Sequence, residues 1–315
     1  MRPAYGNFIA PSGLEARYAA VPAARLPELR AEYERSLAGA SVEPAFRAYV
    51  DDLGRELPPE AEGARTILAC VVPARHAIAR LLLDGEIHEL PLPSGYWDDG
   101  IAGAGLAALL REAAGLKPEE RLTPVGGHLP AKLLAAKCGL VAYGRNGISY
   151  AEGLGSSIAI RAFATDAEFA EADFGEARAL EACAACRACR ERCPTGAIKA
   201  SGFGIDAGRC LSLHNEVPGD FPPSVGARTH NALIGCLRCQ EACPANRSAP
   251  PAFLLDALDE EESAALLAGD SGSPRCPSIS AKLRLGDPGA LAAAMEAYSR
   301  NLRLLLAARE ASTRD

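Results

Sequence analysis

The sequence predicts an α+β protein in which a mixed α/β domain is followed by a two-cluster ferredoxin-like module and C-terminal helices. Three observations predict this order. Apolar runs of strand length and helix length alternate over the first half of the chain, eight of the eleven cysteines fall between positions 183 and 243, and two patterns of helical period follow Pro250. We therefore expect domains at residues 1–172, 173–249 and 250–315.

Strands and helices of the first domain follow from the spacing of its apolar residues. Short apolar runs predict strands at residues 65–73 and 157–165. A hairpin is expected over residues 76–92, because Asp84 and Gly85 form a common tight-turn pair between two apolar runs. Helices are expected over residues 24–40, 100–116 and 129–140.

The composition is that of a soluble globular protein. The 315 residues include 33 basic and 40 acidic side chains, so the net charge of −7 offers no general attraction for nucleic acid. No apolar run reaches the roughly 18 residues that span a bilayer, and the N-terminus has no apolar signal core. We expect a cytoplasmic protein that does not enter a membrane.

Near the C-terminus, FLLDALDEEESAALLAG and LAAAMEAYSRNLRLLLAARE predict helices on either side of a linker at residues 269–277.

The stretch CAACRACRERCP, residues 183–194, has the spacing C-x2-C-x2-C-x3-C-P. Bacterial two-cluster ferredoxins use this spacing, with three cysteines on one [4Fe-4S] cluster and the fourth on the other. The motif is therefore incomplete by itself. A second segment, CLRCQEACP at residues 236–244, offers C-x2-C followed by another Cys-Pro, and Cys210 is the remaining cysteine of the module.

We therefore predict two interleaved ligand sets. The first set is Cys183, Cys186, Cys189 and Cys243, and the second is Cys193, Cys210, Cys236 and Cys239. The alternative reading of paired C-x2-C groups is structural zinc, which four thiolates bind tetrahedrally. Zinc sites rarely have the third cysteine two residues on, so the pattern favours two clusters between which electrons can pass. About 170 residues precede the module, which is more than an electron carrier needs, and they indicate a further cofactor or substrate site.

Four blocks in order resemble the epoxyqueuosine reductases and their shorter relatives. The blocks are AKCGLVAYGRNGISYAEGLGSSIAIRAFATD (136–166), CAACRACRERCPTGAI (183–198), IDAGRCLSLHNE (205–216) and HNALIGCLRCQEACPAN (230–246). The resemblance implies an N-terminal corrinoid-reductase-like domain that binds cobalamin, beside a double [4Fe-4S] module that passes electrons to the cobalt. It also implies reduction of an epoxide on a modified tRNA base, with electrons from an external donor such as a ferredoxin or flavodoxin.

The same resemblance places candidate cofactor-binding residues. The loop YGRN matches a G-K-N-like loop of the family with arginine in place of lysine, and the following G-S also matches. The residues implied to lie near the corrinoid are Tyr143, Gly144, Arg145, Asn146, Gly155, Ser156, Leu211 and Ser212. The alternative for the glycine-rich loop is a plain surface turn.

The chain departs from the family at two places. The family has an aspartate, taken as the proton donor, before the helix that leads into the glycine-rich loop, whereas this chain has no carboxylate between Arg121 and Glu152. His128 stands near that place, and a histidine with a pKa near 6.5 can donate a proton at neutral pH; its alternatives are a cap or a packing residue. The helical-repeat extension that helps to hold tRNA is also not matched. We therefore expect a small-molecule or nucleoside substrate and doubt tRNA.

For the other cysteines and histidines the sequence gives weaker indications of function. His214 and His230 flank the cluster ligands, either as N–H donors to cluster sulfur or as ordinary polar residues. Cys70 and Cys138 lie in apolar runs and are expected to pack in the core, whereas Cys276 is expected to be exposed. The competing function is a non-catalytic electron-transfer protein or reductive activator of a partner's cofactor, which the missing carboxylate favours.

Overall fold

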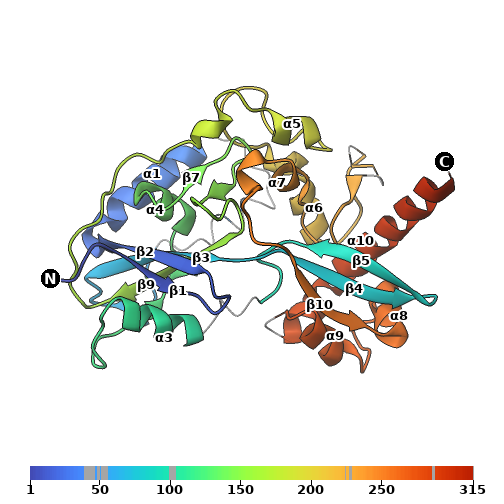
Figure 1. Ribbon diagram of the computed structural model, residues 1–315, viewed down its shortest axis with the longest axis horizontal. Helices are drawn as coiled ribbons and strands as arrows, with labels where there is room; N and C mark the ends of the chain where they lie inside the picture. Colours follow the sequence, from blue (N-terminus) through green and yellow to red (C-terminus); the bar gives the residue numbers. More distant parts are fainter. Residues whose placement is uncertain are drawn as a thin grey trace. The chain divides into compact units, whose positions relative to one another are not determined.

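A computed structural model describes residues 1–38, 47, 50, 56–98, 104–223, 225–226, 229–285 and 288–314 (Figure 1). Its contacts divide the chain into two compact units. Unit 1 comprises Met1–Ala74, Gly100–Cys186 and Arg247–Ala249, and unit 2 comprises Arg75–Asp99, Arg187–Asn246 and Pro250–Asp315. The division of the sequence into three consecutive domains remains a prediction, because these contacts group the chain differently.

Unit 1 is built on a five-stranded antiparallel sheet of order β1-β2-β3-β9-β6. In the central strand, Leu68 lies opposite Ala20 of one neighbour and Phe163 of the other. The strands are β1 (Tyr5–Ile9), β2 (Glu15–Pro22), β3 (Thr66–Pro73), β6 (Thr123–Pro124) and β9 (Ile158–Thr165). The predicted strands at 65–73 and 157–165 are thus β3 and β9, whereas β1, β2 and β6 were not predicted.

Helices cover both faces of this sheet, which explains why β3 is a continuous apolar run. Alternate residues of a strand point to opposite faces. Leu68 and Cys70 therefore pack with α3 (Ala104–Ala113), and Ile67 and Ala69 pack with α1 (Leu26–Ala38) and α4 (Ala131–Lys137) (Figure 1). The three helices correspond to those predicted at 100–116, 24–40 and 129–140, of which residues 39–40 and 100–103 lie outside the described part of the chain.

Unit 2 contains a three-stranded sheet of order β10-β4-β5. Strands β4 (Ala77–Leu83) and β5 (Glu86–Leu92) form the predicted hairpin around Asp84 and Gly85, and β10 (Phe253–Leu258) pairs with β4 in parallel. Helices α8 (Glu260–Ala268), α9 (Cys276–Lys282) and α10 (Pro288–Arg314) share one apolar core with this sheet.

The prediction of a helix from FLLDALDEEESAALLAG is wrong in its first part, because residues 253–258 form β10. Phe253 stacks on Trp97 with ring centroids 5.4 Å apart, so tertiary packing overrides the helical spacing. The helix begins only after Asp259, which forms a reciprocal capping box with Glu262. The predicted linker at 269–277 is also interrupted, since α9 begins at Cys276.

The cysteine-bearing part of the chain contains only short helices. They are η4 (Glu181–Cys183), α5 (Ala188–Arg192), η5 (Ala207–Arg209), α6 (Leu211–Glu216), α7 (Arg238–Glu241) and η7 (Pro244–Asn246). The Cys-Pro pair at 193–194 directly follows α5, and the pair at 243–244 follows α7 after one intervening residue. Among the described residues, no helix is both long enough and apolar enough to cross a bilayer.

Candidate functional site

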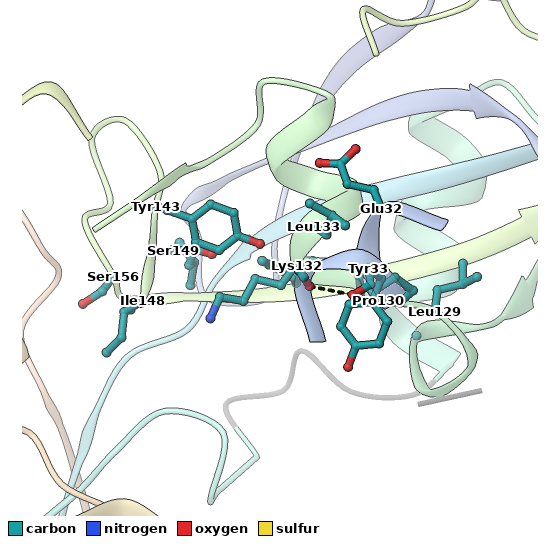
Figure 2. A pocket seen from close by; sticks show the side chains of 15 residues that line it. Glu32, Tyr33, Leu129, Pro130, Lys132, Leu133, Tyr143, Ile148, Ser149 and Ser156 are labelled. Carbon is teal, nitrogen blue, oxygen red and sulfur yellow. Dashed lines mark hydrogen bonds between the residues drawn. The ribbon is translucent and has the colours of Figure 1, made fainter. Parts of the chain in front are cut away.

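A pocket of about 780 Å³ opens on unit 1, between α1, α4 and the hairpin formed by β7 (Ala142–Tyr143) and β8 (Ser149–Tyr150) (Figure 2). Its size lies within the range of ordinary ligand sites. The lining is mainly apolar, and each of these elements adds at least one hydroxyl or charged group. It consists of Glu32, Tyr33, Ser36, Gly126, Leu129, Pro130, Ala131, Lys132, Leu133, Tyr143, Ile148, Ser149, Ser156, Ile158 and Ile160.

The hairpin at the pocket is the predicted YGRN loop, and its turn is fixed by local bonds. Asn146, which is buried, donates from Nδ2 to the Tyr150 hydroxyl at 2.9 Å and accepts from the backbone N–H of Ile148 at 3.3 Å. A Cβ on Gly144 would lie 2.4 Å from the Tyr150 ring, so only glycine fits there. The loop is therefore closely packed where it forms a wall of the pocket, and its contact with a cofactor remains a prediction.

Three polar groups of the lining can meet a ligand. The Ser149 hydroxyl is buried and has no hydrogen-bond partner among the described residues, which leaves it available to a bound molecule. Burial, together with the nearby Glu32 carboxylate, raises the pKa of Tyr143 to about 12, so its hydroxyl stays protonated. The Lys132 ammonium donates to the Gly147 carbonyl at 2.5 Å and lies 5.5 Å from the centre of the Tyr143 ring.

The pocket also contains a carboxylate that sequence reasoning missed. Glu32 comes from α1, about a hundred residues before the segment in which an acid was sought, and no local motif marks it. Its Oε2 accepts from the Lys137 ammonium at 2.6 Å, and the Glu28 carboxylate lies 3.7 Å from the same nitrogen. Lys137 is nearly fully buried, and this pairing holds the Glu32 carboxylate at the pocket wall.

The predicted site residues divide between pocket and non-pocket positions. Tyr143 and Ser156 line the pocket, and Gly144 shapes its wall. His128 ends the short helix η3 (Gly126–His128) and is partly exposed, but it is not part of the lining, although Gly126 and Leu129 on either side are. Leu211 and Ser212 lie on α6 in unit 2 and are not among the lining residues either.

Arg145 belongs to the same hairpin but contacts cysteines instead of the pocket. Its backbone N–H points to the Cys183 sulfur at 3.5 Å, and its guanidinium donates to the carbonyls of Cys183 at 2.6 Å and Cys186 at 3.2 Å. Cys183 and Cys186 belong to unit 1, whereas Cys189 and Cys243 belong to unit 2, so the first ligand set as a group remains a prediction.

Three thiols of the predicted second set lie near one another in unit 2. Burial raises the pKa of Cys236, and the neighbouring Cys210 and Cys193 thiols raise it further. Burial also raises the pKa of Cys210, with a contribution from Cys193. At Cys193, burial is outweighed by hydrogen bonds from Thr195 and from the backbone N–H groups of Ile198 and Ala197, so its pKa is lowered. The lowered pKa of Cys193 favours the thiolate that iron requires, whereas burial of Cys210 and Cys236 favours their neutral thiols as long as no metal is bound.

The segment before Cys236 is held in place by side-chain amides. Asn231 donates from Nδ2 to the Cys236 sulfur at 3.2 Å and accepts from the Leu237 N–H at 2.9 Å. Gly235 has a positive φ of 67°, and a Cβ there would lie 2.8 Å from the Tyr96 ring. Amide N–H bonds to ligand sulfurs are a usual feature of iron-sulfur sites, and the surroundings of Cys236 therefore fit a cluster.

The structure also shows the surroundings of the other histidines and cysteines for which the sequence offered alternatives. His214 bonds the Gly208 carbonyl at 2.8 Å through Nε2. His230 is buried against Phe221, and within the part of the chain that the structure describes neither of its ring nitrogens has a hydrogen-bond partner. Cys70 and Cys138 are buried in apolar clusters as predicted, and Cys276 is partly exposed. In the described part of the chain, no three His, Cys, Asp or Glu side chains converge on a single metal ion.

Comparison with known proteins agrees with these features. Residues 182–246 match the family model described as "4Fe-4S double cluster binding domain". The chain is 31% identical over 121 residues to an epoxyqueuosine reductase of Staphylococcus aureus, covering 38% of this chain and 30% of that protein. It is 43% identical over 75 residues to the enzyme of Shewanella oneidensis, covering 22% and 18%. The matched part is thus less than a third of either relative.

Solved structures extend the likeness to nearly the whole chain. The epoxyqueuosine reductase of Streptococcus thermophilus covers 92% of this chain and 77% of its own, with a TM-score of 0.60 and 19% identity. An epoxyqueuosine reductase with a tRNA-Tyr epoxyqueuosine-modified tRNA stem loop covers 93% and 77%, with a TM-score of 0.55 and 20% identity. The resemblance predicted from the four sequence blocks is confirmed: residues 182–246 form a double 4Fe-4S cluster binding domain, and the chain has the fold of the epoxyqueuosine reductases.

Proposed function

We propose that this chain is an iron-sulfur oxidoreductase that passes electrons through two [4Fe-4S] clusters to the pocket of unit 1, where a substrate is reduced. The observation that carries this proposal is the double-cluster domain on a chain that also has a large ligand pocket in the reductase fold. A simple electron carrier has no need of such a pocket. An external donor of the ferredoxin or flavodoxin class would supply the electrons.

A corrinoid is the cofactor proposed for this pocket. Its periphery carries many amide groups, which suit the unpartnered Ser149 hydroxyl and the protonated Tyr143 hydroxyl, and the glycine at 144 keeps the hairpin wall close-packed. When bound, a corrinoid supplies a cobalt centre that accepts electrons one at a time. The chain's own residues would hold and orient it, and the apolar lining would exclude water.

Epoxyqueuosine is the first substrate to test. The relatives with matched sequence and fold are epoxyqueuosine reductases, and one of them holds a modified tRNA stem loop. The doubt about tRNA that arose from sequence is not supported by these comparisons. In our proposal the proton donor is Lys132, because its ammonium group lines the pocket whereas His128 does not.

Cofactor binding is tested with anaerobically reconstituted protein and hydroxocobalamin. We expect stoichiometric retention after gel filtration and a shifted visible spectrum of the cobalt centre. Ser149→Ala should weaken retention by about fivefold to tenfold, because one hydrogen bond contributes about 1 kcal/mol. Ser36→Ala is the matched control, since Ser36 also lines the pocket but its hydroxyl already donates to the Tyr33 carbonyl at 2.6 Å.

The competing function is an electron-transfer protein or reductive activator. The engagement of Glu32 by Lys137 favours it, because the only acid of the lining is then already paired within the described residues. A chain that retains two clusters but neither binds hydroxocobalamin nor consumes an epoxyqueuosine-containing stem loop would support this function instead.

A further inference from the structure

Arg145 makes three contacts with the first two cysteines of the cluster-binding domain. Its own N–H points to the Cys183 sulfur at 3.5 Å, Nη2 donates to the Cys183 carbonyl at 2.6 Å, and Nε donates to the Cys186 carbonyl at 3.2 Å. One residue therefore contacts the Cys183 sulfur and also holds the backbone carbonyls of both cysteines. Sequence resemblance had placed this residue at the corrinoid.

The hairpin that carries Arg145 also holds the chain that leads into these cysteines. Tyr143 donates from its N–H to the Arg178 carbonyl at 2.8 Å, and its carbonyl accepts from the Leu180 N–H at 2.8 Å, as between neighbouring parallel strands. The Cys183 N–H then bonds the Leu180 carbonyl at 2.9 Å. The cysteine loop is thus fixed to a hairpin whose own turn is held by hydrogen bonds of Asn146.

Physical chemistry gives this arrangement two consequences. The guanidinium is a planar fork that remains charged, so it holds two carbonyls in a fixed relation that an ammonium group cannot reproduce. An N–H bond to a ligand sulfur and a nearby positive charge both stabilise the reduced, more negative cluster, and they raise its reduction potential. Arg145 is suited to both effects.

We propose that Arg145 is a positioning residue that secures the cluster bound by Cys183 and Cys186 and raises its reduction potential. The same hairpin therefore lines the pocket with Tyr143, Ile148 and Ser149 and contacts the predicted cluster ligands through Arg145. This proposal rests on the cluster-binding domain and not on the proposed reaction, so its test uses no substrate and no corrinoid.

The test compares Arg145→Gln and Arg145→Lys in anaerobically reconstituted protein, by iron and sulfide content and by EPR-monitored redox titration. We expect Arg145→Gln to lower one of the two midpoint potentials while the other stays unchanged. The electron-transfer equilibrium should shift by about threefold to tenfold, or roughly 30–60 mV since tenfold is 59 mV for one electron. Arg145→Lys keeps the charge and should give a smaller shift with a lower iron content, because the fork is lost.

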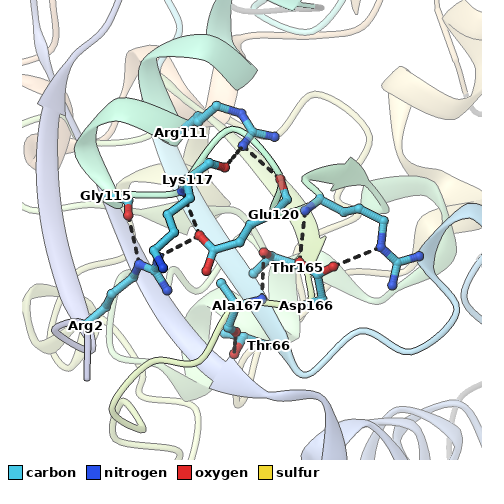
Figure 3. Close-up of polar contacts among 10 residues, drawn as sticks. Arg2, Thr66, Arg111, Gly115, Lys117, Glu120, Thr165, Asp166 and Ala167 are labelled. Carbon is cyan, nitrogen blue, oxygen red and sulfur yellow. Dashed lines mark hydrogen bonds and ion pairs between the residues drawn. The ribbon is translucent and has the colours of Figure 1, made fainter.

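Arg111→Gln is the matched control (Figure 3). Arg111 also donates to two backbone carbonyls, those of Lys117 and Glu120, both at 2.8 Å, but in a turn that carries no cysteine. The Arg111→Gln variant should keep both midpoint potentials and the iron content of the unchanged protein. Selective loss of one cluster in Arg145→Gln would also support the positioning role. Unchanged potentials with full iron content in Arg145→Gln, or an equal effect of Arg111→Gln, would overturn the proposal.

Discussion

The sheet of unit 1 and the cysteine-bearing segment of unit 2, residues 187–246, are stabilised in different ways. In unit 1, β3 is buried along its whole length and packs against helices on both faces. In its described residues the segment of unit 2 contains only short helices, and the amides of Asn215, Asn231 and Asn301 bond its backbone at several points. Unit 1 thus depends on apolar burial, whereas the segment depends on specific polar bonds and, by inference, on its clusters.

Removal of iron should produce the largest difference in stability between the two regions. Metal-binding energy is folding energy where ligands come from loops, so chelation should expose the backbone of residues 187–246. We expect amide hydrogen exchange there to accelerate about a thousandfold, corresponding to about 4 kcal/mol, while β3 keeps its protection. Hydrogen exchange with mass spectrometry measures both regions in one sample. Equal acceleration in β3 would show that the two regions are not independently stabilised.

A pair of substitutions should separate the two kinds of stability. Asn301 is fully buried and donates from Nδ2 to the Asn215 carbonyl at 2.9 Å and the Leu233 carbonyl at 3.1 Å. Asn301→Ala removes both of these buried hydrogen bonds and should cost about 3 kcal/mol of unfolding free energy. Leu68→Ala in β3 should cost about 3 kcal/mol through a cavity.

The two variants should differ in iron content. Asn301→Ala should retain less iron because it loosens the backbone that leads to Cys236, and Leu68→Ala should retain all of it. Denaturant unfolding and iron analysis provide the two readouts. Asn7→Ala serves as a surface control, since the Asn7 amide donates an exposed hydrogen bond to the Glu15 carboxylate at 3.3 Å. Full iron retention in Asn301→Ala would contradict the polar role assigned to this network.

Local signals predicted the elements of the fold that have strong periodicity or turn chemistry. Strands β3 and β9 and the hairpin at Asp84 and Gly85 were predicted, because apolar runs and a turn pair define them. Strand β10 was mistaken for helix, because its conformation depends on β4 and on Trp97, which lie far away in sequence. The two-residue strands of the pocket hairpin are too short to show any period.

Candidate site residues were predictable where spacing alone sets the chemistry. The cysteine spacing predicted the double-cluster domain, which the family model confirms over residues 182–246. The pocket shows the limit, because Glu32 and Lys132 come from two helices that meet only in the folded chain. The role of Arg145 was equally hidden, since its contacts with Cys183 and Cys186 join positions about forty residues apart.

A smaller effect on the free energy of unfolding should come from pH, through the protonation of His230 in unit 2. Burial, together with the positive charge of Arg300, lowers the pKa of His230 to about 4, below the ordinary value of 6.5. The folded protein therefore keeps this imidazole neutral at pH values where the unfolded chain takes up a proton. The stabilising contribution is fully present above pH 6.5 and is lost progressively as the pH falls toward 4.

By pH 5 the loss should reach about 2 kcal/mol, because each pKa unit corresponds to 1.36 kcal/mol. His230→Phe removes the titrating group while keeping a ring against Phe221, whose centroid lies 4.6 Å from that of His230. This variant should therefore lose less unfolding free energy than the unchanged chain between pH 7.5 and pH 5. Both proteins must be compared at equal iron content, since acid also releases cluster iron. Parallel pH profiles for the two proteins would show that His230 does not carry this dependence, and that the polar bonds of unit 2 are insensitive to its protonation.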